Sequence, residues 1–150
     1  MTPKKTPTTR AKHPWTSFRD NGRGHLADAE AKLALLSQNS NAKGIAADAV
    51  LTAIAYADAI TVQRTGLHNT SDHSALADLL VQALGAAADS GQVTRLRRII
   101  ERKNEAQYGG AFWSRQTAET YLEQVRRFTA WAIRVLGERG YGTEHVADIE

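Results

Sequence analysis

Residues 42–65 read AKGIAADAVLTAIAYADAITVQRT, and this stretch decides the fold class. Alanine, the strongest helix former, occupies much of it, and Gly66 follows as a candidate left-handed stop. We therefore expect one long helix from about Ala42 to Thr65. The stripe expected to face a core has helical spacing and contains Ile45, Ala49, Thr52, Tyr56 and Ile60.

The rest of the chain has the same helical character. All three prolines lie within the first fourteen residues, so that no proline interrupts any later segment. Apolar spacing predicts four further helices, at about 25–38, 72–87, 91–107 and 115–136, the last beginning after the N-cap Ser114. Because the connections are short, neighbouring helices should be antiparallel. We expect an all-α fold, an up-and-down four-helix bundle with an additional short helix.

Charge is distributed unevenly along the chain, whose net charge is +3. Residues 1–25 carry a net +5, residues 26–92 a net −4 and residues 93–139 a net +5. We expect three regions: a disordered basic arm at 1–22, the helical bundle at 23–139 and an acidic tail at 140–150. The basic balance favours a polyanionic partner, and the arm would add phosphate contacts that do not depend on sequence.

Several function classes lack the residues they need. The absence of cysteine excludes disulfides, thiolate nucleophiles and cysteine-ligated metals, and is compatible with a reducing compartment. The chain has no Glu-x-x-His pair, no phosphate-binding P-loop and no Gly-x-Ser-x-Gly elbow. The longest uncharged stretches run for about ten residues, whereas a membrane span needs about 20. We expect a soluble cytoplasmic protein with no metal, no cofactor and no membrane partner.

Residues 95–110, RLRRIIERKNEAQYGG, carry the most informative polar pattern. Arg95, Arg98 and Arg102 fall on one helical face, and Asn104 and Tyr108 lie one turn apart near its C-terminal end. Guanidinium groups suit phosphate because they stay charged and donate in a planar fork. The alternative is a solvated basic face that stabilises its own helix.

Residues 25–137 resemble the HEPN domain (higher eukaryotes and prokaryotes nucleotide-binding). The resemblance lies in four stretches: the alanine-rich 46–60, the His-led 71–80, the Arg/Asn…Tyr pattern at 102–109, and 128–131. It implies a helical bundle that usually dimerises. In active members an Arg and a His, four to six residues apart, meet those of the dimer mate and cleave RNA without metal. Several relatives sit beside nucleotidyltransferases.

The resemblance carries over for the arginine and not for the histidine. Arg102 matches, with Arg98 as the other possibility, but positions 106–108 are Ala, Gln and Tyr. A tyrosine has a reference pKa near 10, so Tyr108 is a poor base near neutral pH. We therefore expect a protein that binds RNA or a nucleotide, and we rank RNA cleavage second. For cleavage, Arg102 and Tyr108 are the candidate catalytic pair. The candidate residues for binding RNA or a nucleotide are Arg98, Arg102, Asn104, Tyr108, Asp58 and His73, Asp58 being placed to pair with one of the arginines.

Three hypotheses stay open at this point. The first is an RNA- or nucleotide-binding homodimer within a toxin–antitoxin or defence-type module, with a nucleotidyltransferase or an antitoxin as its candidate partner. The second is a metal-independent endoribonuclease in which Arg102 stabilises the transition state. The third is a structural dimerisation or partner-binding bundle without a nucleotide ligand.

Overall fold

The computed structural model describes residues 8–70 and 72–138, and this part of the chain is mostly helical, as the all-α class predicts. The predicted tail at 140–150 and residues 1–7 of the predicted arm lie outside the described residues. The described α-helices are α1 (Trp15–Leu35), α2 (Lys43–Thr65), α3 (Leu76–Leu84), α4 (Ser90–Glu101), α5 (Lys103–Gln107) and α6 (Arg115–Val135). Single 3₁₀ turns, η1 (His73–Ala75) and η2 (Gly85–Ala87), flank α3.

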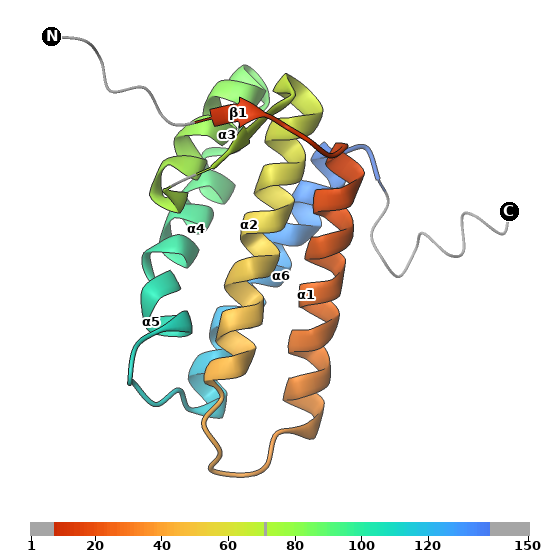
Figure 1. Ribbon diagram of the computed structural model, residues 1–150. Helices are drawn as coiled ribbons and strands as arrows, with labels where there is room; N and C mark the ends of the chain where they lie inside the picture. Colours follow the sequence, from red (N-terminus) through yellow and green to blue (C-terminus); the bar gives the residue numbers. More distant parts are fainter. Residues whose placement is uncertain (1–7, 71, 139–150) are drawn as a thin grey trace, which may run out of the picture.

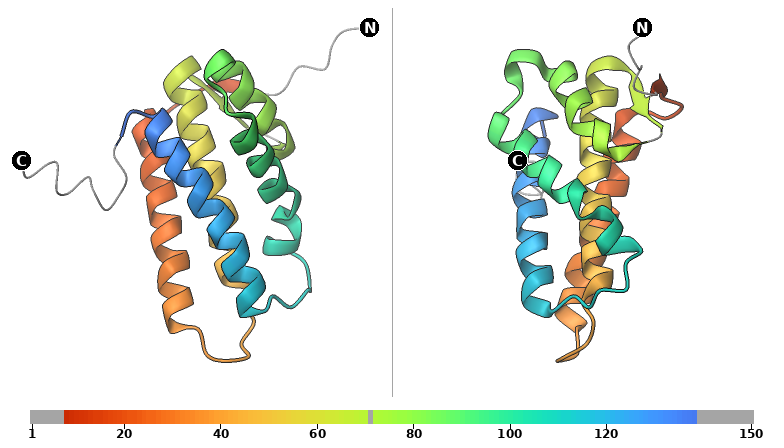
Figure 2. Two further views of the ribbon diagram at one scale, coloured as in Figure 1. Left: turned by 180° about the vertical axis from the view of Figure 1, so that it is seen from behind. Right: turned by 90° about the vertical axis from the view of Figure 1, so that its left-hand side faces the viewer.

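Helix α2 lies at the centre of the molecule (Figure 1) and contacts every other α-helix of the described chain. It is buried almost continuously from Ile45 to Val62, so the predicted apolar stripe is only part of its buried surface. Its many alanines let neighbouring helices approach closely on several sides. In Figure 2, α1 and α6 run lengthwise beside it, while α3, α4 and α5 form the remaining side.

Helix α2 also has the length and composition of a membrane span, a property that the search for uncharged stretches missed. Its most apolar window has a mean hydropathy of 1.6, and 83 % of that window is buried inside the protein. A helix that is apolar all round belongs either in a protein core or in a bilayer. The packing of α1, α3 and α6 around α2 accounts for its composition as a core helix.

Helix α1 begins at Trp15, ten residues before the predicted start at residue 25. Gly22 and Gly24 lie inside the helix rather than in a flexible arm. Gly22 faces Tyr56 of α2 so closely that an added Cβ would lie 2.6 Å from the ring carbon Cδ2. The glycine that we interpreted as part of a disordered segment is therefore a helix-packing contact.

The first residues described also correct the predicted arm at 1–22. Strand β1 (Thr8–Arg10) pairs antiparallel with β2 (Leu67–Asn69), which follows α2 directly. Gly66, with φ 74°, ends α2 in the left-handed conformation that the sequence predicts and turns the chain into β2. The two paired strands have three residues each and lie far apart in the sequence. A local alternation of apolar and polar residues therefore does not predict their pairing.

The predicted helix at 91–107 is interrupted at Arg102 and forms two helices, α4 and α5. In a continuous helix the Ile99 carbonyl would accept the N–H of residue 103. Here it accepts the N–H of Arg102, at 3.3 Å, and the hydroxyl of Tyr121, at 2.6 Å. A contact from α6 thus competes for the carbonyl that would continue the helix. Helix α4 therefore ends at Glu101 and α5 begins at Lys103.

Helix α6 agrees closely with its prediction. Ser114 is the N-cap, and its Oγ accepts the N–H of Thr117 at 3.1 Å. The side chains of Leu122, Val125 and Phe128 are fully buried against the core. The opposite face of this helix is polar and forms one wall of the candidate site.

Candidate functional site

A groove of about 520 Å³ lies between α4 and α6, and we call it the arginine groove. Arg95, Arg98 and Arg102 line it from the α4 side, so the three arginines predicted to share a helical face do so. Polar, uncharged side chains line it from α6. The lining consists of Gly91, Thr94, Arg95, Arg98, Ile99, Arg102, Gln116, Thr117, Thr120, Tyr121 and Gln124.

The periodicity of α4 places the arginines on this surface. Val93, Leu96 and Ile99 point into the core, and the basic positions follow on the flank of the same helix. Asp89 caps the helix by accepting the N–H of Gln92 at 3.0 Å, so α4 begins at Ser90, one residue before the predicted start at 91. The arginines lie toward the C-terminal half of α4, where the helix dipole favours positive charge.

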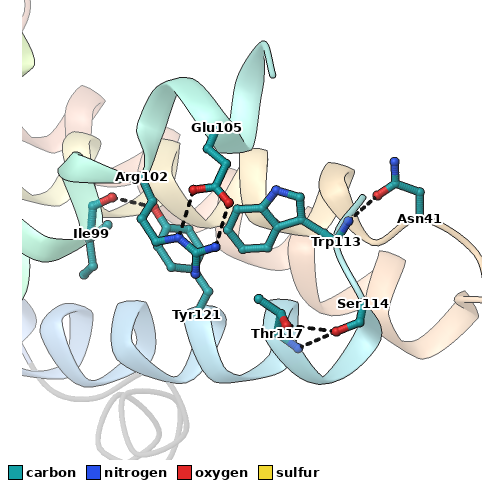
Figure 3. Close-up of polar contacts among 8 residues, drawn as sticks. All are labelled: Asn41, Ile99, Arg102, Glu105, Trp113, Ser114, Thr117 and Tyr121. Carbon is teal, nitrogen blue, oxygen red and sulfur yellow. Dashed lines mark hydrogen bonds and ion pairs between the residues drawn. The ribbon is translucent and has the colours of Figure 1, made fainter. Parts of the chain in front are cut away.

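Arg102 is held by the most specific set of contacts in the groove (Figure 3). Its Nε and Nη2 donate to the Glu105 carboxylate at 3.3 and 2.9 Å. Its guanidinium carbon lies 4.2 Å from the ring centre of Trp113 and 5.7 Å from that of Tyr121. The hydrogen bond to Glu105 raises the pKa of Arg102, and the same bond lowers the pKa of Glu105. Arg102 is therefore fixed in direction by one carboxylate and two rings.

The rings of Trp113 and Tyr121 pack beneath the Arg102 guanidinium. Trp113 is 1 % exposed, and its backbone N–H donates to Asn41 Oδ1 at 3.0 Å, which ties this loop to the start of α2 (Figure 3). Burial raises the pKa of Tyr121 far above its ordinary value, and its hydroxyl is already committed to the Ile99 carbonyl. Tyr121 therefore serves as a structural ring and not as a proton acceptor.

The other two arginines differ in availability. Arg95 donates to Gln124 Oε1 of α6, across the groove, at 2.9 Å and to Gln92 Oε1 of its own helix at 2.8 Å, so two neutral amides hold it. Arg98 is exposed, and no ion pair or hydrogen bond of its side chain is found among the described residues. Of the three, Arg98 is the guanidinium most open to an external anion.

Asn104 and His73 lie on the other side of α4, apart from the arginine groove. They line a second groove of about 490 Å³ together with Arg97 and Lys103. Burial, followed by the charge of Lys103, lowers the pKa of His73. The predicted grouping of Asn104 with Arg98 and Arg102 is therefore wrong, because Asn104 shares the helical spacing of Arg97 and Glu101, which line the same second groove.

Tyr108 lies apart from both grooves. It is 75 % exposed, and its ring is 5.5 Å from the Lys103 ammonium. It caps the C-terminal end of α5, whereas Arg102 precedes the first residue of that helix. The structure therefore does not bring together Arg102 and Tyr108, the residues predicted as a catalytic pair.

Asp58 pairs with a histidine and not with an arginine. It is 6 % exposed, and its Oδ2 lies 3.4 Å from Nε2 of His68 in β2. Burial raises the pKa of Asp58, and the hydrogen bond to Asp58 raises the pKa of His68. His68 also packs against Phe18, with ring centres 4.7 Å apart. The prediction that Asp58 orients Arg98 or Arg102 is wrong; it anchors the strand pair to α2.

One further cluster of possible ligands lies between α1 and α2. Donor atoms of His25, Asp28 and Asp48 are all within 4.8 Å of one another. However, the Lys32 ammonium lies 2.7 Å from Asp48 Oδ2 and already supplies a positive charge there. The sequence search missed this group because two of its members come from one helix and the third from the next.

Comparison with protein-family models, with curated proteins and with solved structures finds no match for this chain. Sequence reasoning found the arginines of α4. It missed Glu105, the ring partners of Arg102 and the α6 wall, because these contacts join segments whose mutual placement only the fold defines.

Proposed function

We propose that this protein binds RNA or a phosphate-bearing nucleotide in the arginine groove. The observation that carries the proposal is the placement of Arg95, Arg98 and Arg102 along one side of this groove. At 1.5 Å per residue, they extend over about 10 Å of helix. Such a row can contact more than one phosphate group at once.

The opposite wall supports the same chemistry. Hydroxyl and amide groups from Thr117, Thr120 and Gln124 face the arginines and can donate to phosphate or sugar oxygens. No aspartate or glutamate is among the described residues that line the groove, so no lining carboxylate repels an anion. The balance of net positive charge and neutral donors is suited to a phosphate backbone.

The lining also favours binding over cleavage. No histidine, lysine or carboxylate is among the described residues that form the groove, and the buried Tyr121 hydroxyl is engaged. General acid–base catalysis needs a titratable group within hydrogen-bond reach of the reacting proton. We therefore place endoribonuclease activity second to binding.

The resemblance to the HEPN domain supports the wider proposal. Antiparallel neighbours among α1, α2, α4 and α6 suit the four-helix arrangement of that family (Figure 1). On this basis we propose a cytoplasmic homodimer in a toxin–antitoxin or defence-type module, with a nucleotidyltransferase or an antitoxin as partner. Sedimentation of the purified protein tests the dimer, since a monomer at all concentrations would contradict it.

Binding of a fluorescently labelled oligouridine, followed by anisotropy, tests the ligand class. We expect Arg98→Gln to weaken binding by about fivefold and to flatten the salt dependence. Arg97→Gln is the matched control, because Arg97 has the same charge on the same helix but faces the second groove, where it pairs with Asp78 at 2.9 Å. No binding at low salt, or an equal loss in both variants, would contradict the proposal.

The same oligonucleotide tests cleavage when incubated with the protein and EDTA. Intact RNA after long incubation agrees with a binding domain. Cleavage by the wild-type protein that disappears in Arg102→Gln would establish the endoribonuclease alternative instead.

A further inference from the structure

The Glu105 carboxylate occupies the edge of Arg102 that a phosphate would use. Nε and Nη2 form the side-on fork of a guanidinium, and both donate to Glu105. Phosphate oxygens bind arginine through the same paired geometry. One of the three guanidinium groups of the arginine groove is therefore already bound by a carboxylate, that of Glu105, which does not itself line the groove.

The ion pair is open to exchange. The Arg102 side chain is 39 % exposed and that of Glu105 is 45 % exposed, so water reaches both partners. Ion pairs between exposed side chains contribute little to stability, because water screens them and two long side chains must be ordered. Glu105 also belongs to α5, a helix of only five residues. Little structure has to change for this carboxylate to leave.

The rings beneath Arg102 do not depend on Glu105. The Trp113 ring, 4.2 Å from the guanidinium carbon, is buried and packs against Tyr121 with ring centres 5.3 Å apart. Stacking on Trp113 keeps the guanidinium plane in place when its carboxylate partner is replaced (Figure 3). Arg102, which lines the arginine groove, therefore keeps its aromatic support when the ion pair opens.

We propose that Glu105 is a built-in competitor for the phosphate site and sets the affinity of the arginine groove, an inference that rests on the function proposed above. A ligand must replace the carboxylate on Arg102 with its own oxygens. Phosphate does this because it carries equal or greater negative charge and more acceptor oxygens. Neutral ligands and ligands with a single carboxylate group do not displace Glu105 from Arg102. Glu105 thus discriminates in favour of phosphate groups and lowers the affinity for all anions.

Substitution of Glu105 by glutamine tests this role. The amide side chain would keep one acceptor oxygen for Arg102 and remove the charge, so the fold should be retained. We expect Glu105→Gln to bind the labelled oligouridine about threefold more tightly than the wild type at low salt. The gain should disappear when Arg102→Gln is combined with Glu105→Gln, because the competition acts through that guanidinium.

Glu119→Gln is the matched control. Glu119 has the same 45 % side-chain exposure, but its partner at 2.8 Å is Arg115, which does not line the arginine groove, whereas the partner of Glu105 does. Its substitution changes the net charge by the same amount as Glu105→Gln and should change the affinity for the oligouridine only slightly. Far-ultraviolet circular dichroism of each variant confirms that the helices are retained.

The possible results separate the two proposals. Weaker binding by Glu105→Gln would overturn the competitor role and make Glu105 a positioning residue for Arg102. Equal gains for Glu105→Gln and Glu119→Gln would also overturn it, since net charge alone would explain them. Binding by neither the wild type nor any variant would instead overturn the proposed function. Wild-type binding that depends on Arg98, with no gain in Glu105→Gln, would remove only the inference about Glu105.

Discussion

At the scale of single residues, Gly22 defines how closely α1 and α2 pack. A Cβ at this position would lie 2.6 Å from Cδ2 and 2.7 Å from Cε2 of Tyr56. Tyr56 is 1 % exposed and has little room to move. Glycine in a helix interior is unfavourable compared with alanine, so its presence here is explained by the tight contact.

The two glycines of α1 should respond oppositely to alanine. Gly22→Ala should lower the free energy of unfolding by about 2 kcal/mol, because the new methyl group overpacks against Tyr56. Gly24→Ala should raise it by about 0.5–1 kcal/mol, since nothing lies within 4 Å and alanine favours helix. Urea denaturation measures both. Stabilisation by Gly22→Ala would show that the helices separate without cost.

A second residue-scale feature is the pair of Asp58 and His68. The folded-state pKa of His68 lies above its ordinary 6.5 because of the hydrogen bond to Asp58. A raised folded pKa means that the native state binds the proton more tightly than the unfolded chain. The stabilisation from this pair is therefore fully present below pH 6.5 and is lost as the pH rises through the folded-state value. Asp58, whose pKa is also raised, contributes in the same direction at lower pH.

Replacement of His68 should reveal this dependence. We expect His68→Asn to lower the free energy of unfolding by about 1 kcal/mol below pH 6.5, with a smaller difference well above it. Denaturation at several pH values measures the difference from wild type. The exposed His13 supplies the control substitution, His13→Asn. A difference that grows with increasing pH would contradict the assigned ion pair.

At the scale of elements, the ends of helices show how far the sequence could predict the fold. The end of α2 at Gly66 and the start of α6 at Ser114 depend on the local residues, and both predictions are confirmed. The break at Arg102 depends on the Tyr121 hydroxyl of another helix, which no local pattern reveals. The close approach of Gly22 to Tyr56, within the part of α1 that was assigned to the arm, likewise depends on another helix. The sequence therefore predicted a helix end correctly only where residues close in sequence make the hydrogen bonds that define that end.

The N-cap of α4 gives a test at this scale. Asp89→Ala should lower the free energy of unfolding by about 1 kcal/mol, because the Asp89 carboxylate accepts the N–H of Gln92. Ser90→Ala, one residue later, should have little effect, since Ser90 is the first residue of the helix and alanine is a strong helix former. Thermal denaturation compares the two. A larger loss in Ser90→Ala would contradict the assignment of Asp89 as the capping residue.

At the scale of the whole molecule, the candidate site was predictable only in part. The positive charge between residues 93 and 139 pointed to the segment of α4, and Arg98 and Arg102 do share one groove there. Asn104, His73, Tyr108 and Asp58 do not join them. Asn104 has the helical spacing of Arg97 and Glu101, which lie on the other side of α4. The net charge of a segment can be summed from the sequence alone, whereas the direction in which each side chain points depends on the folded structure.

The basic residues near the start of the chain provide a whole-molecule test of the proposed RNA binding. Neutralising both Lys4 and Lys5 to glutamine should weaken oligouridine binding at low salt. Each lost phosphate contact should reduce the slope of log affinity against log salt by about 0.7. Arg134→Gln, an exposed arginine outside the groove, is the control. An unchanged slope in the Lys4 and Lys5 variant would confine phosphate contacts to other parts of the chain.

The central position of α2 has a consequence on the timescale of minutes to days. Its backbone amides are enclosed by neighbouring helices along nearly its whole length. Deuterium from the solvent can reach them only when the entire protein opens, whereas the five-residue α5 can open by itself. The slowest-exchanging amides should therefore lie between residues 49 and 60, and their rates should report the global stability of the molecule. Exchange at α5 would then measure how readily the helix that carries Glu105 opens while the core stays closed.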